Sequence, residues 1–129
     1  MADALLIDST VLIDEQRGEA RARAFLEPLL TRGAALIHPV SAAEALAGVN
    51  DRRELAALDE LVARFKLAHT RHTDFTAAIA YVRLFALSHR VGWPDCLIAA
   101  TALRLRLPVV TVNDRHFRVL RGLSVIRPY

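Results

Sequence analysis

The chain has 129 residues, a length suited to one compact domain with its own hydrophobic core. Its 17 lysine and arginine residues against 14 acidic residues give a net charge of +3, which permits nucleic-acid binding without demonstrating it. No apolar run approaches the roughly 20 residues that span a membrane, residues 1–7 lack the features of a signal peptide, and the single cysteine, Cys96, excludes an internal disulfide, so we expect a cytoplasmic protein.

The first half of the chain alternates short aliphatic runs with longer helical stretches. In order, it predicts a strand over 4–8, a short helix, a helix over 19–31, a strand over 34–37, and helices over 41–47 and 54–65. The first strand is continuously apolar and should be buried on both faces. Ser9 or Thr10 is expected to cap the short helix. Pro28 should kink the helix over 19–31, and Gly48 should end the helix over 41–47.

The second half continues the alternation. In order, it predicts a short strand over 67–70, helices over 73–90 and 94–106, and strands over 109–111 and 124–126. Pro94 stands where a helix best tolerates proline, and the helix that it begins is apolar nearly all round, so it should be buried. Strands that alternate with helices indicate a parallel sheet covered on both faces. The sequence therefore predicts a single α/β domain over residues 1–129.

Four acidic residues recur where a strand is followed by a helix. They are Asp8, Glu44, Asp95 and Asp114, and Asn113 stands beside the last of them. In parallel α/β sheets these junctions gather at the carboxyl edge, where ligands usually bind. We therefore expect residues that are far apart in the sequence to converge there.

Each acidic residue also has a purely structural explanation. Asp8 can cap the first helix, and Ser41 with Glu44 has the spacing of a capping box. Asp95 and Asp114 would be favoured near helix N-termini by the helix dipole alone. Together these explanations are less satisfactory, because several carboxylates in one place need a compensating cation. Mg²⁺ or Mn²⁺ would suit oxygen ligands and could activate a water for hydrolysis of a phosphate ester.

The order and spacing of four short motifs resemble those of the PIN-domain nucleases, and within them the VapC-type toxins of bacterial toxin–antitoxin pairs. The resemblance covers nearly the whole chain. The motifs are LIDSTVLID over 6–14, SAAEALAGV over 41–49, PDCLIAATA over 94–102 and TVNDRHF over 111–117. The third motif is the most specific. In the fourth motif both Asn113 and Asp114 match the family pattern, and we favour Asp114 as the charged member.

This resemblance implies a three-layer α/β/α sandwich around a parallel sheet of four to five strands, with Mg²⁺- or Mn²⁺-dependent cleavage of RNA. It implies Asp8 and Asp95 as the main metal ligands, with Glu44 and Asp114 completing the shell. Thr10, Thr111 and Asn113 would position a water or a phosphate oxygen. The resemblance also implies a cognate antitoxin and a homodimer. The hydrophobic fraction of 53% also favours a homodimer, because it exceeds the ~45–50% usual for soluble domains.

Other functions fit the sequence less well. A receiver-like phosphoacceptor domain would need a lysine near the fifth strand, but the only lysine, Lys66, precedes the third. A PIN-like nuclease acting on DNA or in RNA processing, and an inactive module that binds RNA or a partner protein, remain as alternatives. The histidines are expected to be surface or partly buried residues. Cys96 is expected in the core, and Trp93 is expected to pack against its loop rather than stack on a base.

Overall fold

The structure is a computed structural model, and it describes residues 3–129. Five strands form its sheet: β1 (Leu5–Ile7), β2 (Ala35–Ile37), β3 (Lys66–Leu67), β4 (Val109–Val110) and β5 (Val125–Ile126). The helices are α1 (Ser9–Gln16), α2 (Ala20–Thr31), α3 (Pro39–Ala47), α4 (Arg52–Ala63), α5 (His72–His89), α6 (Trp93–Leu105) and α7 (Asp114–Arg118). Among these residues, no helix is both long enough and apolar enough to cross a membrane.

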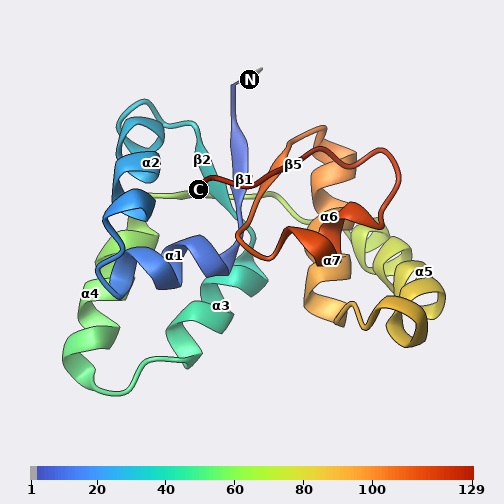
Figure 1. Ribbon diagram of the computed structural model, residues 1–129, viewed down its shortest axis with the longest axis horizontal. Helices are drawn as coiled ribbons and strands as arrows, with labels where there is room; N and C mark the ends of the chain where they lie inside the picture. The colour runs from blue at the N-terminus through green and yellow to red at the C-terminus, as the bar shows by residue number, and fades with distance from the viewer. Residues whose placement is uncertain (1–2) are drawn as a thin grey trace.

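The strands lie in the order β3-β2-β1-β4-β5, and every neighbouring pair is parallel. Leu6 at the centre of β1 is paired with Leu36 on one side and with Val109 on the other. All five carboxyl ends therefore meet at one edge of the sheet. Figure 1 shows the sheet between two groups of helices, with α1, α2 and α4 on one side and α5, α6 and α7 on the other. This arrangement confirms the α/β/α sandwich around a parallel sheet.

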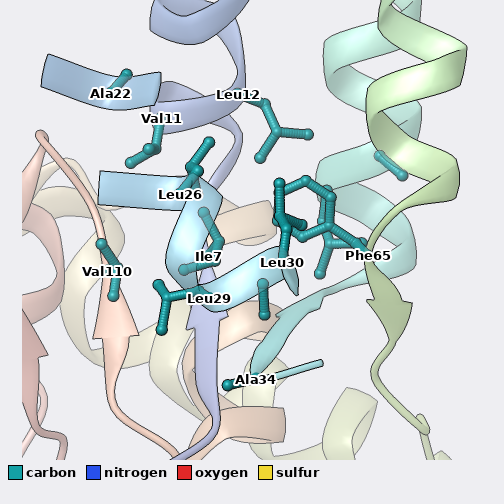
Figure 2. Packing of buried hydrophobic residues seen from close by; sticks show 13 residues of the cluster. Ile7, Val11, Leu12, Ala22, Leu26, Leu29, Leu30, Ala34, Phe65 and Val110 are labelled. Carbon is teal, nitrogen blue, oxygen red and sulfur yellow. The ribbon is translucent and has the colours of Figure 1, made fainter. Parts of the chain in front are cut away.

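Successive strand residues point to opposite faces of the sheet, and this alternation builds two cores. Ile7 and Val110 face the helices α1 and α2, where they join a buried cluster. Figure 2 shows the leucines of α2 in this cluster beside Ile7. Leu6 and Val109 face the opposite side and pack with residues of α6 and α7. Both sets are buried, as the continuous apolar run of the first strand predicts.

Helix α6 is buried on all sides over its middle section, which confirms the prediction for this segment. Every residue from 96 to 102 is buried there, and Phe117 of α7 packs in the same cluster. Helix α5 lies against α6 but covers it with one face only. Its other face exposes Phe75, Ile79, Leu84 and Leu87.

A buried polar network ties α3 to α5 and α6. The Nδ1 atom of His38 accepts a hydrogen bond from the Val40 N–H at 3.0 Å, so its Nε2 atom carries the hydrogen and donates to Thr101 at 3.1 Å. The Thr101 hydroxyl donates in turn to Asp74, which also accepts two hydrogen bonds from Arg104. Burial lowers the pKa of His38 to about 4, so this residue is a neutral structural imidazole. It is fully buried, unlike the surface or partly buried position expected for it.

Three local predictions differ from the structure. Helix α3 begins at Pro39 rather than at Ser41, because His38 caps it, and the Ser41 hydroxyl is buried with no hydrogen-bond partner among the described residues. Asp8, and not Ser9 or Thr10, occupies the cap position of α1. Lys66 lies within β3, at the opposite edge of the sheet from β5, which is the wrong place for a receiver-like lysine.

Candidate active site

Asp8 lies directly after β1 at the centre of the carboxyl edge. It occupies the cap position of α1, but its side chain makes no capping hydrogen bond. Its Oδ2 atom accepts hydrogen bonds from the hydroxyls of Thr111 at 2.9 Å and Thr10 at 3.0 Å. The side chain is buried, and burial raises the pKa of this carboxyl, although the two hydroxyls partly oppose the increase. The structural explanation by capping therefore does not account for Asp8.

Glu44 reaches the same edge from the second half of α3. The start of this helix at Pro39 leaves Glu44 beyond the first turn, so it cannot form the capping box expected from its spacing with Ser41. Partial burial raises the pKa of Glu44, and the negative charges of Asp8 and Asp95 raise it further. Glu44 therefore lies within the electrostatic reach of both other carboxylates.

Asp95 belongs to the first turn of α6, where the helix dipole favours a carboxylate. Its Oδ2 atom lies 3.1 Å from the Nδ1 atom of His116 in α7. Burial raises the pKa of Asp95, and the charge of Asp8 adds to this effect. The helix terminus thus favours the charged form of Asp95, whereas burial and the neighbouring carboxylate of Asp8 disfavour it.

These side chains line one cleft of about 400 Å³ at the carboxyl edge. Its lining comprises Asp8, Ser9, Thr10, Glu44, Arg90, Gly92, Pro94, Asp95, Asn113 and His116. Asp8 and Glu44 lie in segments that follow β1 and β2, as the position of ligand sites in parallel sheets predicts, whereas Asp95 lies at the start of α6, which follows helix α5 rather than a strand. The cleft also contains a cation, Arg90, whose φ of 54° places it in the left-handed region at the end of α5.

The structure does not place Asp114 where the sequence analysis expected it. Asp114 is the first residue of α7 and forms ion pairs with Arg118 at 2.9 Å and with Arg127 at 3.1 Å. The hydrogen bond from Arg118 is the largest of the influences that hold the pKa of Asp114 below its ordinary value. Asn113 lines the cleft in its place. Of the two residues that match the fourth motif, Asn113 thus lines the cleft, whereas Asp114 lies outside its lining and is paired with two arginines.

The two threonines of the predicted site are close to Asp8 as expected. Their hydroxyls are occupied by that carboxylate, and the Thr111 hydroxyl also accepts a hydrogen bond from the Asn113 N–H at 2.9 Å. They therefore hold Asp8 and the start of α7 in place. Arg90 and Gly92 also line the cleft but were not predicted from the sequence. The only signal that could have found them is their position just before the third motif.

Two further residues differ in how well they were predicted. Cys96 is completely buried, which confirms its expected place in the core. Trp93 is 61% exposed, so the expectation that it packs against its loop is wrong. As the first residue of α6 it precedes the buried section of that helix.

The donor set of the cleft fits a hard divalent cation. Asp8, Glu44 and Asp95 supply carboxylate oxygens, and the raised pKa of each reflects burial or negative charge that a cation would relieve. Among the described residues no three such ligands already lie close enough together to surround an ion. Of the three carboxylates, Glu44 is the most exposed.

A parallel α/β sandwich with carboxylates gathered at its carboxyl edge defines the PIN class of domain. The family model described as "PIN domain" matches residues 5–123, and the chain belongs to this family. Ribonuclease VapC10 of Mycobacterium tuberculosis is 35% identical to it over 123 residues, which cover 93% of this chain and 90% of that protein. Ribonuclease VapC19 of the same organism is 36% identical over 123 residues, covering 92% and 96% respectively.

Solved structures agree with this fold. A DNA-bound VapBC complex from Salmonella typhimurium contains a chain that superposes with a TM-score of 0.81 at 19% identity, over 98% of both chains. A toxin–antitoxin complex from Klebsiella pneumoniae gives a TM-score of 0.79 at 23% identity, again over 98% of both chains. At such identities the likeness concerns the fold alone.

Proposed function

We propose that this protein is a metal-dependent endoribonuclease and the toxin of a toxin–antitoxin pair. The observation that carries the proposal is the convergence of Asp8, Glu44 and Asp95 in one cleft, where the side chains of Asp8 and Glu44 make no capping hydrogen bond. The relatives named as VapC ribonucleases, similar over nine-tenths of the chain, support RNA as the substrate.

In this proposal Asp8 and Asp95 hold Mg²⁺ or Mn²⁺, and Glu44 completes the site directly or through a water. The bound ion would lower the pKa of a water and neutralise charge on the phosphodiester. Glu44, the most exposed of the three carboxylates, would accept a proton from the attacking water. Thr10 and Thr111 keep Asp8 oriented through their hydroxyl groups.

Arg90 supplies the positive charge that the three carboxylates lack. Arg90 lines the same cleft, and its guanidinium group would suit a phosphate oxygen of the substrate. A polyanion would otherwise be repelled by three carboxylates, so an arginine at the cleft lowers the cost of its approach. We assign Arg90 to substrate binding rather than to the chemical step.

Two protein partners belong to the proposal. An antitoxin is supported by the similarity to chains from toxin–antitoxin complexes. A second copy of this chain is supported by the apolar composition and by the exposed apolar residues of α5.

Cleavage of a mixed RNA pool by the purified, partner-free protein tests the proposed function. We expect cleavage with Mg²⁺ or Mn²⁺ and none with EDTA. Asp95→Asn and Asp8→Ala should abolish it, whereas Asp114→Asn should retain it because Asp114 lies outside the cleft. Asp59→Asn, an exposed acid of α4, serves as the matched control. Cleavage by Asp95→Asn at the parent rate would refute the assignment of the site.

A further inference from the structure

The carboxylate of Asp95 has one hydrogen-bonding side chain within residues 3–129, the imidazole of His116. The Nδ1 atom of His116 lies 3.1 Å from Oδ2 of Asp95. His116 precedes Phe117, which is completely buried in the core that α6 and α7 share. This anchor fixes the short helix α7 against α6, so the imidazole is held at the cleft although 21 positions separate it from Asp95 in the sequence.

The same ring nitrogen also lies 2.9 Å from the side-chain amide of Asn113. A nitrogen of a neutral imidazole either donates or accepts a hydrogen bond. A bare Nδ1 could accept from the Asn113 amide, but its lone pair would then face a carboxylate oxygen. In the alternative arrangement Nδ1 carries the hydrogen and donates it to Asp95. The side-chain amide of Asn113 is then rotated by about 180°, so that its carbonyl oxygen, rather than its NH₂ group, faces this N–H group. The second arrangement is favoured because a charged acceptor makes the stronger hydrogen bond.

We propose that His116 is a positioning residue for Asp95, and that its Nδ1–H group holds this carboxylate in the orientation that binds a divalent cation. Oδ2 is then engaged by the imidazole, and Oδ1 is free to face Asp8 and the cation. Asn113 contacts the same ring nitrogen and helps to keep the ring in place. This inference rests on the proposed metal-dependent function and assigns a task to a residue that touches neither cation nor substrate.

Substitution of His116 by asparagine and by glutamine distinguishes this positioning role from a general structural role. The amide nitrogen of asparagine takes the place of Nδ1, whereas that of glutamine takes the place of Nε2. We expect His116→Ala and His116→Gln to weaken Mn²⁺ binding about tenfold, the lower end of the usual effect of losing a hydrogen bond to a metal ligand. His116→Asn should stay close to the parent. His69→Ala, an exposed histidine outside the cleft, is the control.

Binding of Mn²⁺ alone is measured by the loss of the free-ion signal in electron paramagnetic resonance, and thermal melts confirm that each variant folds. RNA cleavage is then followed against Mn²⁺ concentration, where the required concentration should rise in parallel with the dissociation constant. Parent-like Mn²⁺ binding by His116→Ala would overturn the inference, and so would equally weak binding by the asparagine and glutamine variants. If His116→Ala does not fold, the comparison of asparagine with glutamine decides alone. A parent chain that binds Mn²⁺ but cuts no RNA would refute the proposed function and leave this comparison valid.

Discussion

The hydroxyl groups of Thr10 and Thr111 lie 3.3 Å apart although 101 positions separate them in the sequence. Both donate to the same oxygen of Asp8, so the ends of two neighbouring strands are joined through one carboxylate. A buried carboxylate with two hydroxyl donors is better tolerated than one without them. This arrangement makes the two threonines responsible for keeping Asp8 inside the fold.

The substitution Thr111→Val should therefore destabilise the protein. It keeps the shape of the side chain but removes a donor to Asp8 and leaves the Asn113 N–H without its acceptor. We expect a loss of about 2–3 kcal/mol in the free energy of unfolding, the usual cost of unpaired buried polar groups. Urea denaturation in EDTA measures it, with Thr111→Ser as the variant that should stay near the parent. Identical midpoints for valine and parent would show that these hydrogen bonds contribute nothing.

The pH dependence of stability should reveal the burial of Asp8. Because burial raises its pKa above the ordinary value of 3.8, the folded state holds its proton more tightly than the unfolded state. The stability from this group is full below that value and is lost as the pH rises through the raised pKa. Asp8→Asn cannot titrate, so its stability relative to the parent should increase from about pH 4 upward.

Urea unfolding of both proteins in EDTA across this pH range measures the difference, and saturating Mn²⁺ provides the complementary test. The cation should stabilise the parent at neutral pH, because a ligand bound only by the folded state shifts the equilibrium toward it. It should have a smaller effect on Asp8→Asn. A stability difference that falls as the pH rises would contradict the raised pKa.

The buried network around Asp74 leads to a second prediction, in which stability depends on pH in the opposite direction from that expected for Asp8. Hydrogen bonds from Arg104 are the main cause that lowers the pKa of Asp74 to about 2. Its stabilising contribution is therefore complete above pH 4 and is lost as the pH falls toward 2. Asp74→Ala should cost about 3 kcal/mol at neutral pH, since it removes the carboxylate that accepts hydrogen bonds from Arg104 and Thr101.

Chemical denaturation at pH 7 and at pH 3 measures both parts of this prediction. The cost of Asp74→Ala should be smaller at the lower pH. Asp59→Ala, an exposed acid of the same type, should change stability by less than about 0.5 kcal/mol. An equal cost for the two substitutions would mean that the network does not stabilise the fold.

The exposed apolar residues of α5 predict that two copies of the chain form a dimer. Leu84 is 65% exposed and Leu87 is 98% exposed, and the same helix also exposes Phe75 and Ile79. We expect a dimer at micromolar concentration in light scattering, and a monomer after Leu84→Glu with Leu87→Glu. Leu55→Glu, which changes an exposed leucine of α4, should remain dimeric. A parent protein that is monomeric at this concentration would refute the prediction.

Much of the fold could be predicted from the pattern of apolar residues. The runs at 4–8 and 109–111 and the stripe of 94–106 are long or apolar enough to identify β1, β4 and α6. Element boundaries were less secure, because they depend on single caps. His38, rather than Ser41, begins α3, since its ring nitrogen accepts the Val40 N–H, and histidine is not among the usual capping residues.

The sequence alone determined which acidic residues follow strands, and a parallel sheet brings such positions to one edge. Asp8 and Glu44 could be recognised in this way, whereas Asp95 follows helix α5 and could be recognised through the third motif of the family resemblance. Only the tertiary structure decided between Asn113 and Asp114, because one step along a helix turns a side chain by about 100° and no apolar pattern sets that rotation in a helix as short as α7. The contact of His116 with Asp95 and the place of Arg90 in the cleft depend on how α5, α6 and α7 pack together. Such contacts between distant segments arise from the packing of whole elements, and local sequence does not encode them.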